Sequence, residues 1–217
     1  MKTIVVLSGG LDSTTVLYNL LDRKHEVKAI SFDYGQRHKK ELDYAKQTTD
    51  KLGIEHEVID MAFMKKYISN PALTGDIEVP EGHYEDENMK QTVVPNRNMI
   101  MASIAIGYAV NIDYDGVALG VHLGDHEVYP DCRPEFIYAL KVIALVSNYK
   151  KIRIITPYLY VCKDGIVKDG IRLKADYSKT WTCYKGGDLA CGKCGSCQER
   201  LEAFNDNNIK DPIEYDK

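Results

Sequence analysis

The chain has 217 residues, 44% of them hydrophobic, and carries a formal net charge of −4. This length suits one α/β domain with a small appendage, and the hydrophobic fraction is sufficient for a full core. The negative net charge argues against direct binding of nucleic acid or of an anionic membrane. There is no apolar run of about 18 residues, which a transmembrane helix requires, and no signal-peptide pattern. We therefore expect a cytoplasmic protein.

The first sixty residues alternate between predicted strands and predicted helices. Residues 3–7 form a continuous β-rich run, which is typical of a strand buried on both faces. Helix-like segments follow at residues 12–21 and 38–52, and further strand-like segments at residues 27–32 and 57–60. This alternation predicts a parallel sheet with right-handed crossovers.

Between residues 61 and 92 the apolar residues follow neither a strand-like nor a helix-like period. This stretch holds several prolines and glycines and is acidic from residue 78 to residue 87. We interpret it as a long excursion near the site that could act as a lid. Helices are predicted at residues 99–110, 134–147 and 196–204, and strands at residues 116–121 and 152–156. A short helical segment is expected after the fifth strand, although residues 163–170 contain two glycines and make a poor helix. The polar tail at residues 205–217 is expected to fray.

The segment SGGLDS at residues 8–13 connects the first strand to the first helix. Its glycines let backbone N–H groups approach an anion closely, and the helix N-terminus adds a partial positive charge. It lacks the lysine of a Walker A loop and does not match G-x-G-x-x-G. Asp12 beside phosphates implies a Mg²⁺ ion. The structural alternative is a simple capped turn between strand and helix.

Four cysteines gather near the C-terminus, at Cys183, Cys191, Cys194 and Cys197. Two-residue gaps let neighbouring thiolates bind one ion, and four sulfurs with no open position are typical of structural zinc. An iron–sulfur cluster and disulfides are the alternatives, although cysteines so close in sequence make poor disulfide partners. Cys132 and Cys162 are expected to be small buried residues.

SGGLDS resembles the PP-loop of the ATP pyrophosphatase families. That resemblance implies a HUP-like, doubly wound, mainly parallel five-stranded sheet, here with a C-terminal four-cysteine zinc knuckle. It also implies that ATP activates an oxygen-bearing carbon as an adenylate, with release of pyrophosphate. We divide the chain into a PP-loop domain at residues 1–182, a zinc-binding element at residues 183–204 and a polar tail at residues 205–217.

Further segments narrow the resemblance. FDYGQRH at residues 32–38, with Glu41 one turn later, follows the second strand, and VPNRN at residues 94–98 opens an apolar helix. YPDCR at residues 129–133 follows the fourth strand, and Lys163 follows the fifth. Together with the cysteine spacing, these segments resemble the 7-cyano-7-deazaguanine synthase (QueC) family over nearly the whole chain. The resemblance implies a homodimer that uses ATP, ammonium and 7-carboxy-7-deazaguanine, with adenylated acid and amide intermediates.

The resemblance also implies site residues. Nucleotide contacts are expected from the end of the first strand and the start of the first helix: Leu7, Ser8, Gly9, Gly10, Leu11, Asp12, Ser13, Thr14 and Thr15. Asp12, Arg37 and Lys163 are the expected catalytic residues, Arg37 as an anion clamp and Lys163 as the partner of the polyphosphate. For Arg37 and Lys163 the alternative is a solvated surface position. Arg97, Asn98, Asp131 and Arg133 are expected to bind the substrate, with Asp131 on the N–H edge of its guanine-like ring.

Two departures from the family pattern bear on these expectations. Asn96 replaces the usual glycine, although asparagine tolerates the left-handed conformation that this turn needs. His126, Glu127 and Val128 replace a small Ser-Gly pair, which leads to a second hypothesis, that the product is the amide. Two further hypotheses are a tRNA sulfurtransferase and a non-enzymatic zinc-knuckle module.

Overall fold

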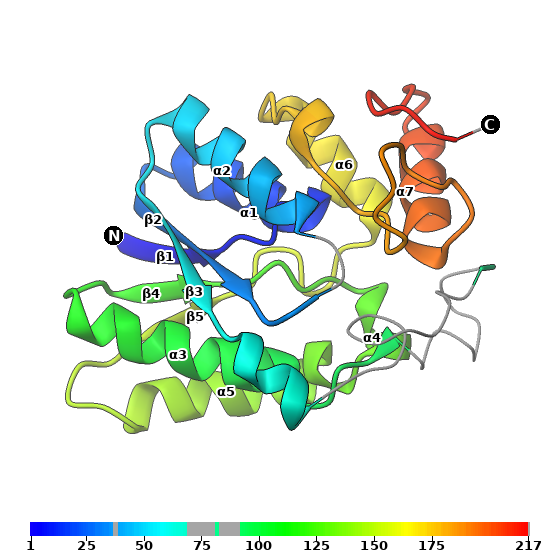
Figure 1. Ribbon diagram of the computed structural model, residues 1–217. Helices are drawn as coiled ribbons and strands as arrows, with labels where there is room; N and C mark the ends of the chain where they lie inside the picture. The colour runs from blue at the N-terminus through cyan, green and yellow to red at the C-terminus, as the bar shows by residue number, and fades with distance from the viewer. Residues whose placement is uncertain (37–38, 69–80, 83–91, 217) are drawn as a thin grey trace.

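The computed structural model describes residues 1–36, 39–68, 81–82 and 92–216. Its centre is a five-stranded sheet in the order β3-β2-β1-β4-β5, and every neighbouring pair of strands is parallel (Figure 1). The strands are β1 (Lys2–Val6), β2 (Glu26–Asp33), β3 (His56–Asp60), β4 (Gly116–Ala118) and β5 (Arg153–Ile155). The expected α/β class, strand number and parallel arrangement are confirmed.

Helices cover both faces of the sheet (Figure 1). One face carries α1 (Leu11–Asp22), α2 (Lys40–Leu52), α6 (Lys163–Arg172) and α7 (Gly195–Asp206). The other carries α3 (Arg97–Asn111) and α5 (Pro134–Val146), with the short α4 (Asp125–Val128) near the carboxyl edge. Side chains of β1 alternate between the two cores: Ile4 packs on the α3 and α5 side, and Val5 on the α1 and α6 side. The continuous apolar run in β1 reflects this burial on both faces.

The strand order reverses between β1 and β4. The chain runs outward from β1 to β2 and β3, and then returns to place β4 on the other side of β1. Open α/β sheets bind ligands at the carboxyl ends of the strands beside such a reversal. The loop at residues 8–13 lies at this position, directly after β1.

The short helical segment expected after the fifth strand is confirmed as α6, and it runs through both glycines of residues 163–170, so the expectation of a poor helix there is wrong. A Cβ on Gly170 would lie 1.7 Å from the hydroxyl oxygen of Tyr177, so glycine is required where this residue packs against the helix. Tertiary packing thus outweighs the low helix propensity of glycine. Asn96 takes φ +57°, so the expected left-handed turn before α3 is present.

The expectation of a fraying tail is also wrong for residues 205–216. The guanidinium of Arg200, which is fully buried in α7, donates to both carboxylate oxygens of Asp211 at 2.7 and 2.9 Å. Tyr215 pairs with Ala190 as a β-bridge and donates its hydroxyl to Asp211. A bidentate buried ion pair holds this polar segment against the cysteine-rich region.

Most of the excursion at residues 61–92 lies outside the described residues, and with it the expected lid. Within it, Ala62–Lys66 form a short 3₁₀ helix after β3. Among the described helices, none combines the length and the apolar character needed to cross a membrane.

Candidate active site

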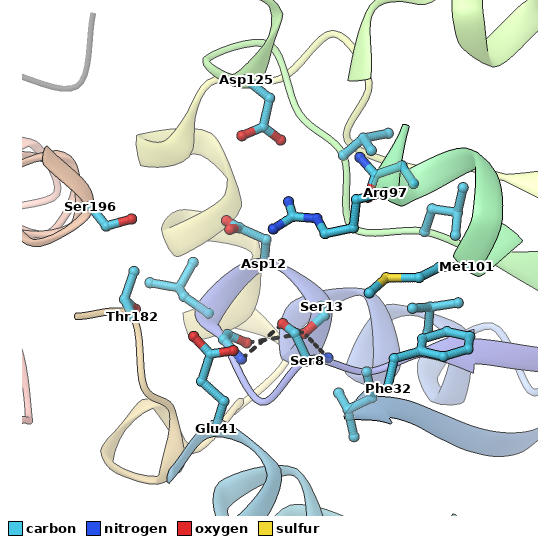
Figure 2. Close-up of a pocket in the computed structure, with 18 of the residues that line it drawn as sticks. Ser8, Asp12, Ser13, Phe32, Glu41, Arg97, Met101, Asp125, Thr182 and Ser196 are labelled. Carbon is cyan, nitrogen blue, oxygen red and sulfur yellow. Dashed lines mark hydrogen bonds between the residues drawn. The ribbon is translucent and has the colours of Figure 1, made fainter. Parts of the chain in front are cut away.

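A cavity of about 270 Å³ opens at the carboxyl ends of β1, β2 and β4. Figure 2 shows side chains from several elements converging on it. Its lining includes the loop residues Leu7, Ser8, Gly10, Leu11, Asp12 and Ser13, together with Tyr34, Glu41, Arg97, Asn98, Asp125, Tyr129, Cys132, Lys163, Trp181, Thr182, Cys183, Tyr184 and Ser196. Parts of the chain far apart in sequence therefore form one site.

The glycine-rich loop is held open by its own hydroxyl groups. The backbone N–H of Ser8 donates to Ser13 Oγ at 3.1 Å, and the N–H of Gly10 donates to Ser8 Oγ at 3.2 Å. Gly9 has φ +86°, and a Cβ there would lie 2.0 Å from the carbonyl oxygen of Glu41. Any other residue at position 9 would push α2 away from the loop, so the glycine sets this close approach.

Six of the nine expected nucleotide-binding residues line the cavity, and Gly9, Thr14 and Thr15 do not. Gly9 shapes the loop from behind. Thr15 donates its hydroxyl to the Leu11 carbonyl and contacts the hydroxyl of Tyr177, which fits a structural function.

Lys163 is buried between two carboxylates. Its Nζ lies 2.9 Å from Asp12 Oδ2 and 3.0 Å from Glu199 Oε2, and its side chain is 8% exposed. Burial lowers the pKa of Lys163, but the charges of Asp12 and Glu199 raise it by more, so the ammonium stays charged. The alternative of a solvated surface lysine is wrong.

The pKa values of the two carboxylates that flank Lys163 shift in opposite directions. Burial raises the pKa of Asp12, but Lys163 and His122 together outweigh burial and leave that pKa below its usual value. Burial raises the pKa of Glu199, and there the charge of Lys163 does not compensate. Asp12 is thus the firmly ionised partner of Lys163, and its Oδ1 is buried without a hydrogen-bond partner in the described part of the chain.

His122 lies behind this group and is 1% exposed. Its Nδ1 accepts the backbone N–H of Gly124 at 3.1 Å, so the proton of the neutral ring is on Nε2. Nε2 lies 3.4 Å from Asp125 Oδ1 and 3.9 Å from both Asp12 Oδ2 and Glu199 Oε1. The imidazole therefore lies beside three carboxylates, one each from α4, α1 and α7, and its Nε2 makes no hydrogen bond within the described part of the chain.

Arg97 supplies a second cation, from the first turn of α3. Its guanidinium lies 5.8 Å from the ring centre of Tyr34 and 5.9 Å from that of Tyr129. Burial lowers the pKa of Arg97, but the neighbouring tyrosines raise it above the usual value, so the charge is retained. No carboxylate of the described residues lies within ion-pair distance of it, which leaves the guanidinium available to an anionic ligand.

The other expected substrate residues lie in different surroundings. Asn98 lines the cavity and contacts Cys132 Sγ, whereas Asp131 accepts the backbone N–H of Asn98 at 2.9 Å and so anchors the start of α3. Arg133 is exposed and donates to the His126 carbonyl. Neither Asp131 nor Arg133 lines the cavity. Arg37 lies outside the described residues.

The segment that departs from the family pattern also stays out of the cavity. Asp125–Val128 form the short helix α4, in which Val128 is buried in the core and Glu127 is exposed. Neither His126, Glu127 nor Val128 lines the cavity. The replacement therefore changes the core behind the site rather than its surface.

The four cysteines near the C-terminus form a buried cluster. One sulfur from each residue lies within 4.8 Å of all the others, and the sulfurs of Cys191 and Cys197 are 3.9 Å apart. A tetrahedron with Zn–S bonds of about 2.3 Å has sulfurs roughly 3.8 Å apart, so the cluster is consistent with a zinc site. The N–H of Cys194 donates to Cys191 Sγ at 3.3 Å, and Gly192 has φ +65°, which lets the loop turn around the sulfur.

The remaining two cysteines, Cys132 and Cys162, lie outside the four-cysteine cluster. Cys132 is buried as expected, and burial raises its pKa far above the usual value, which makes it a poor nucleophile. Cys162, expected to be buried, is exposed because it occupies the N-cap of α6.

The cysteine cluster and the cavity share a wall. Trp181, Thr182, Cys183 and Tyr184 all line the cavity, and the N–H of Trp181 donates to the Gly9 carbonyl at 2.9 Å. On the other side of the cluster, Cys197 lies in α7 two residues before Glu199. The cluster therefore fixes both the segment at residues 181–184 beside the glycine loop and the carboxylate that pairs with Lys163.

Three functional candidates were missed from the sequence. His122 and Asp125 follow β4, a place where ligand-binding side chains are common, and that position is the signal that could have found them. Glu199 resembles an ordinary solvated helix residue, and only its distance from Cys197 hints at its burial.

Comparisons with known proteins agree with this geometry. Residues 2–208 match the family model described as queuosine biosynthesis protein QueC. The chain is 54% identical to the 7-cyano-7-deazaguanine synthase of Alteromonas mediterranea, over 99% of both chains. It is 52% identical to the enzyme of that name from Pseudoalteromonas atlantica, again over 99% of both chains.

A solved structure shares the fold at much lower identity. The U34-tRNA thiolase NcsA from Methanococcus maripaludis, with its 4Fe-4S cluster, matches with a TM-score of 0.51 and 18% identity, over 96% of this chain and 64% of that chain. This likeness shows the fold alone and gives no support to sulfur transfer. On its full-length relatives, the chain belongs to the QueC family of 7-cyano-7-deazaguanine synthases, which are ATP-dependent ligases.

Proposed function

We propose that the cavity converts 7-carboxy-7-deazaguanine and ammonia into 7-cyano-7-deazaguanine in two ATP-dependent activations. The observation that carries this proposal is the meeting of the glycine loop, Lys163 and Arg97 around one cavity. The loop N–H groups and Lys163 suit a polyphosphate, and Arg97 suits the substrate carboxylate.

The chemistry needs activation because carboxylate and amide oxygens are poor leaving groups. A carboxylate oxygen attacks the α-phosphorus of ATP and pyrophosphate leaves. Ammonia then adds to the acyl carbon, and AMP departs with that oxygen, which yields the amide and releases a proton. The amide oxygen attacks a second ATP in the same way, and loss of AMP and of both amide protons forms the nitrile.

Residues of this chain stabilise the charge on the departing pyrophosphate and hold Lys163 in place. Lys163 Nζ and the loop N–H groups stabilise the negative charge that develops on the departing pyrophosphate. Asp12 and Glu199 hold Lys163 in place, and the buried setting excludes water, which would hydrolyse either adenylate. Arg37, expected as a further clamp, stays a prediction. The substrate contacts expected of Asp131 and Arg133 also stay predictions.

Two metal ions fit the residues present. Asp12 would hold Mg²⁺ brought in with ATP, because its Oδ1 is buried without a hydrogen-bond partner among the described residues. When bound, Mg²⁺ neutralises phosphate charge. The four cysteines would hold one structural Zn²⁺, which makes residues 183–204 a metal-stabilised element beside the PP-loop domain at residues 1–182. Free ammonium is the proposed nitrogen source.

We further propose that two copies associate through α5. Tyr138, Val142, Leu145 and Val146 lie on one face of this helix, and their exposed fractions run from 42% to 74%. An exposed apolar stripe of this kind is typical of an interface between subunits.

The double variant Val142→Glu/Val146→Glu is expected to be monomeric in light scattering coupled to size exclusion, where the unmodified protein is dimeric. Two carboxylates would have to be buried in the interface. Ile209→Glu, at an exposed apolar residue after α7, is the matched control and should stay dimeric. A double variant of unchanged mass, or a monomeric parent, would contradict the proposed interface.

The function is tested by incubating the protein with the carboxylated deazapurine, ATP, Mg²⁺ and ammonium. AMP and pyrophosphate release, with the nitrile as final product in mass spectrometry, is expected. Accumulation of the amide alone would reject nitrile synthesis.

A further inference from the structure

The proposed substrate presents a distinctive edge. The six-membered ring of a 7-deazaguanine carries N1–H and the exocyclic 2-amino group side by side, so two donors point the same way. An ionised carboxylate, with two acceptor oxygens and no donor, is the side chain that pairs with both. The residue that recognises this ring is therefore sought among the carboxylates that line the cavity.

Among the residues that the structure describes, three carboxylates line the cavity: Asp12, Glu41 and Asp125. Asp12 is committed to Lys163 at 2.9 Å. Asp125 accepts the backbone N–H of His122 at 3.2 Å and lies 3.4 Å from its ring nitrogen. Asp131, the residue expected from the sequence for this task, lies outside the lining and is committed to the N–H of Asn98.

Glu41 remains. Its carboxylate makes no ion pair or hydrogen bond with the other described residues. It is in the first turn of α2, and Figure 2 shows it directed toward Ser8 and Thr182. The close approach of its carbonyl oxygen to Gly9 fixes this turn against the glycine loop. Glu41 is therefore fixed at the wall of the cavity, and neither of its oxygens is engaged by another of the described residues.

The charges of Glu41 and Arg97 also suit the two ends of the substrate. Figure 2 shows Glu41 and Arg97 reaching the cavity from α2 and α3, on opposite sides. Burial raises the pKa of Glu41 to about 7 although the charge of Arg97 lowers it, and two hydrogen bonds from a ligand would favour the ionised form. The substrate is planar, with paired donors on one edge and a carboxylate on the other ring. Tyr34 and Tyr129 flank the guanidinium and offer aromatic surface to such a plane.

We propose that Glu41 is the specificity-determining residue of the site, accepting N1–H and the 2-amino group of the deazaguanine ring while Arg97 faces the 7-carboxylate. This inference rests on the proposed function, and it takes over the task that the sequence suggested for Asp131. A site built to satisfy two donors rejects an analogue that lacks one of them, because a buried acceptor is then left unpaired.

The test compares two substrates and three proteins. The substrates are the carboxylated deazaguanine and its 2-deamino analogue, and AMP release is followed with saturating ammonium. The unmodified protein should prefer the guanine form in kcat/KM by roughly 10–100-fold. Glu41→Gln should lose kcat/KM for the guanine form by a similar factor, bring the preference close to one, and keep the KM for ATP. Asp43→Asn, at an exposed carboxylate on the same helix, should behave as the unmodified protein.

The outcomes separate the two proposals. If the unmodified protein releases no AMP with either substrate, the proposed function fails. If it turns over but uses both substrates equally well, the assignment of Glu41 is overturned whether or not the variant folds. An unchanged preference in Glu41→Gln, or a raised KM for ATP with the preference intact, would also overturn it and would place Glu41 on the nucleotide.

Discussion

Asp12→Ala is expected to lower kcat for AMP release by about 10²–10³-fold, the loss typical of removing one group that stabilises transition-state charge. Asp12 holds Lys163 Nζ at 2.9 Å and is the proposed Mg²⁺ ligand, so the variant loses the Mg²⁺ ligand and one of the two carboxylates that position Lys163. Steady-state kinetics with saturating ATP measure the effect.

The fold should survive this change. Lys163 keeps Glu199 as a partner at 3.0 Å, so its buried charge stays paired, and the melting temperature should change little. Asp22→Ala removes an exposed carboxylate from the other end of α1 and is the matched control. An Asp12→Ala protein that turned over at the parent rate would remove this residue from the mechanism.

Cys194→Ser is expected to lower the free energy of unfolding by more than about 4 kcal/mol, because metal binding at a structural site contributes directly to folding. Cys194 is a fully buried member of the four-cysteine cluster. Chemical denaturation and metal content, measured on the same sample, quantify the loss. A strong chelator should lower the melting temperature of the unmodified protein in the same direction.

Activity should fall together with the metal, since residues 181–184 and Glu199 are held by the cluster. Cys162→Ser, at an exposed cysteine outside the cluster, should change neither stability nor turnover. Equal melting temperatures with and without chelator, together with a stable Cys194→Ser protein, would show that these cysteines hold no structural ion.

The features that could be predicted from the sequence are those that depend on residues a few positions apart along the chain. The glycine loop and the cysteine spacing are local patterns, and each is recognisable because its chemistry needs certain residue types a few positions apart. The strand β1 was found for the same reason, since burial on both faces leaves an unbroken apolar run.

Features that depend on contacts between distant segments could not be predicted. Glu41 was noticed only as part of a motif, because nothing local shows that its carboxylate is left without a partner among the described residues beside the glycine loop. Asp131 seemed the better candidate for the ring edge, yet it binds the start of α3. The helix α6 was expected only as a short, poor helix, because its glycines carry a local cost that packing against Tyr177 offsets.

The central claim is that ATP takes an oxygen from the substrate in this cavity. It is tested most directly with substrate labelled by ¹⁸O in both carboxylate oxygens, followed by mass spectrometry of the nucleotide and phosphate products. The account predicts that each AMP carries one labelled oxygen, that two labelled AMP molecules form per nitrile, and that pyrophosphate is unlabelled. Nitrile formation with unlabelled AMP, or with the label in inorganic phosphate, would contradict it.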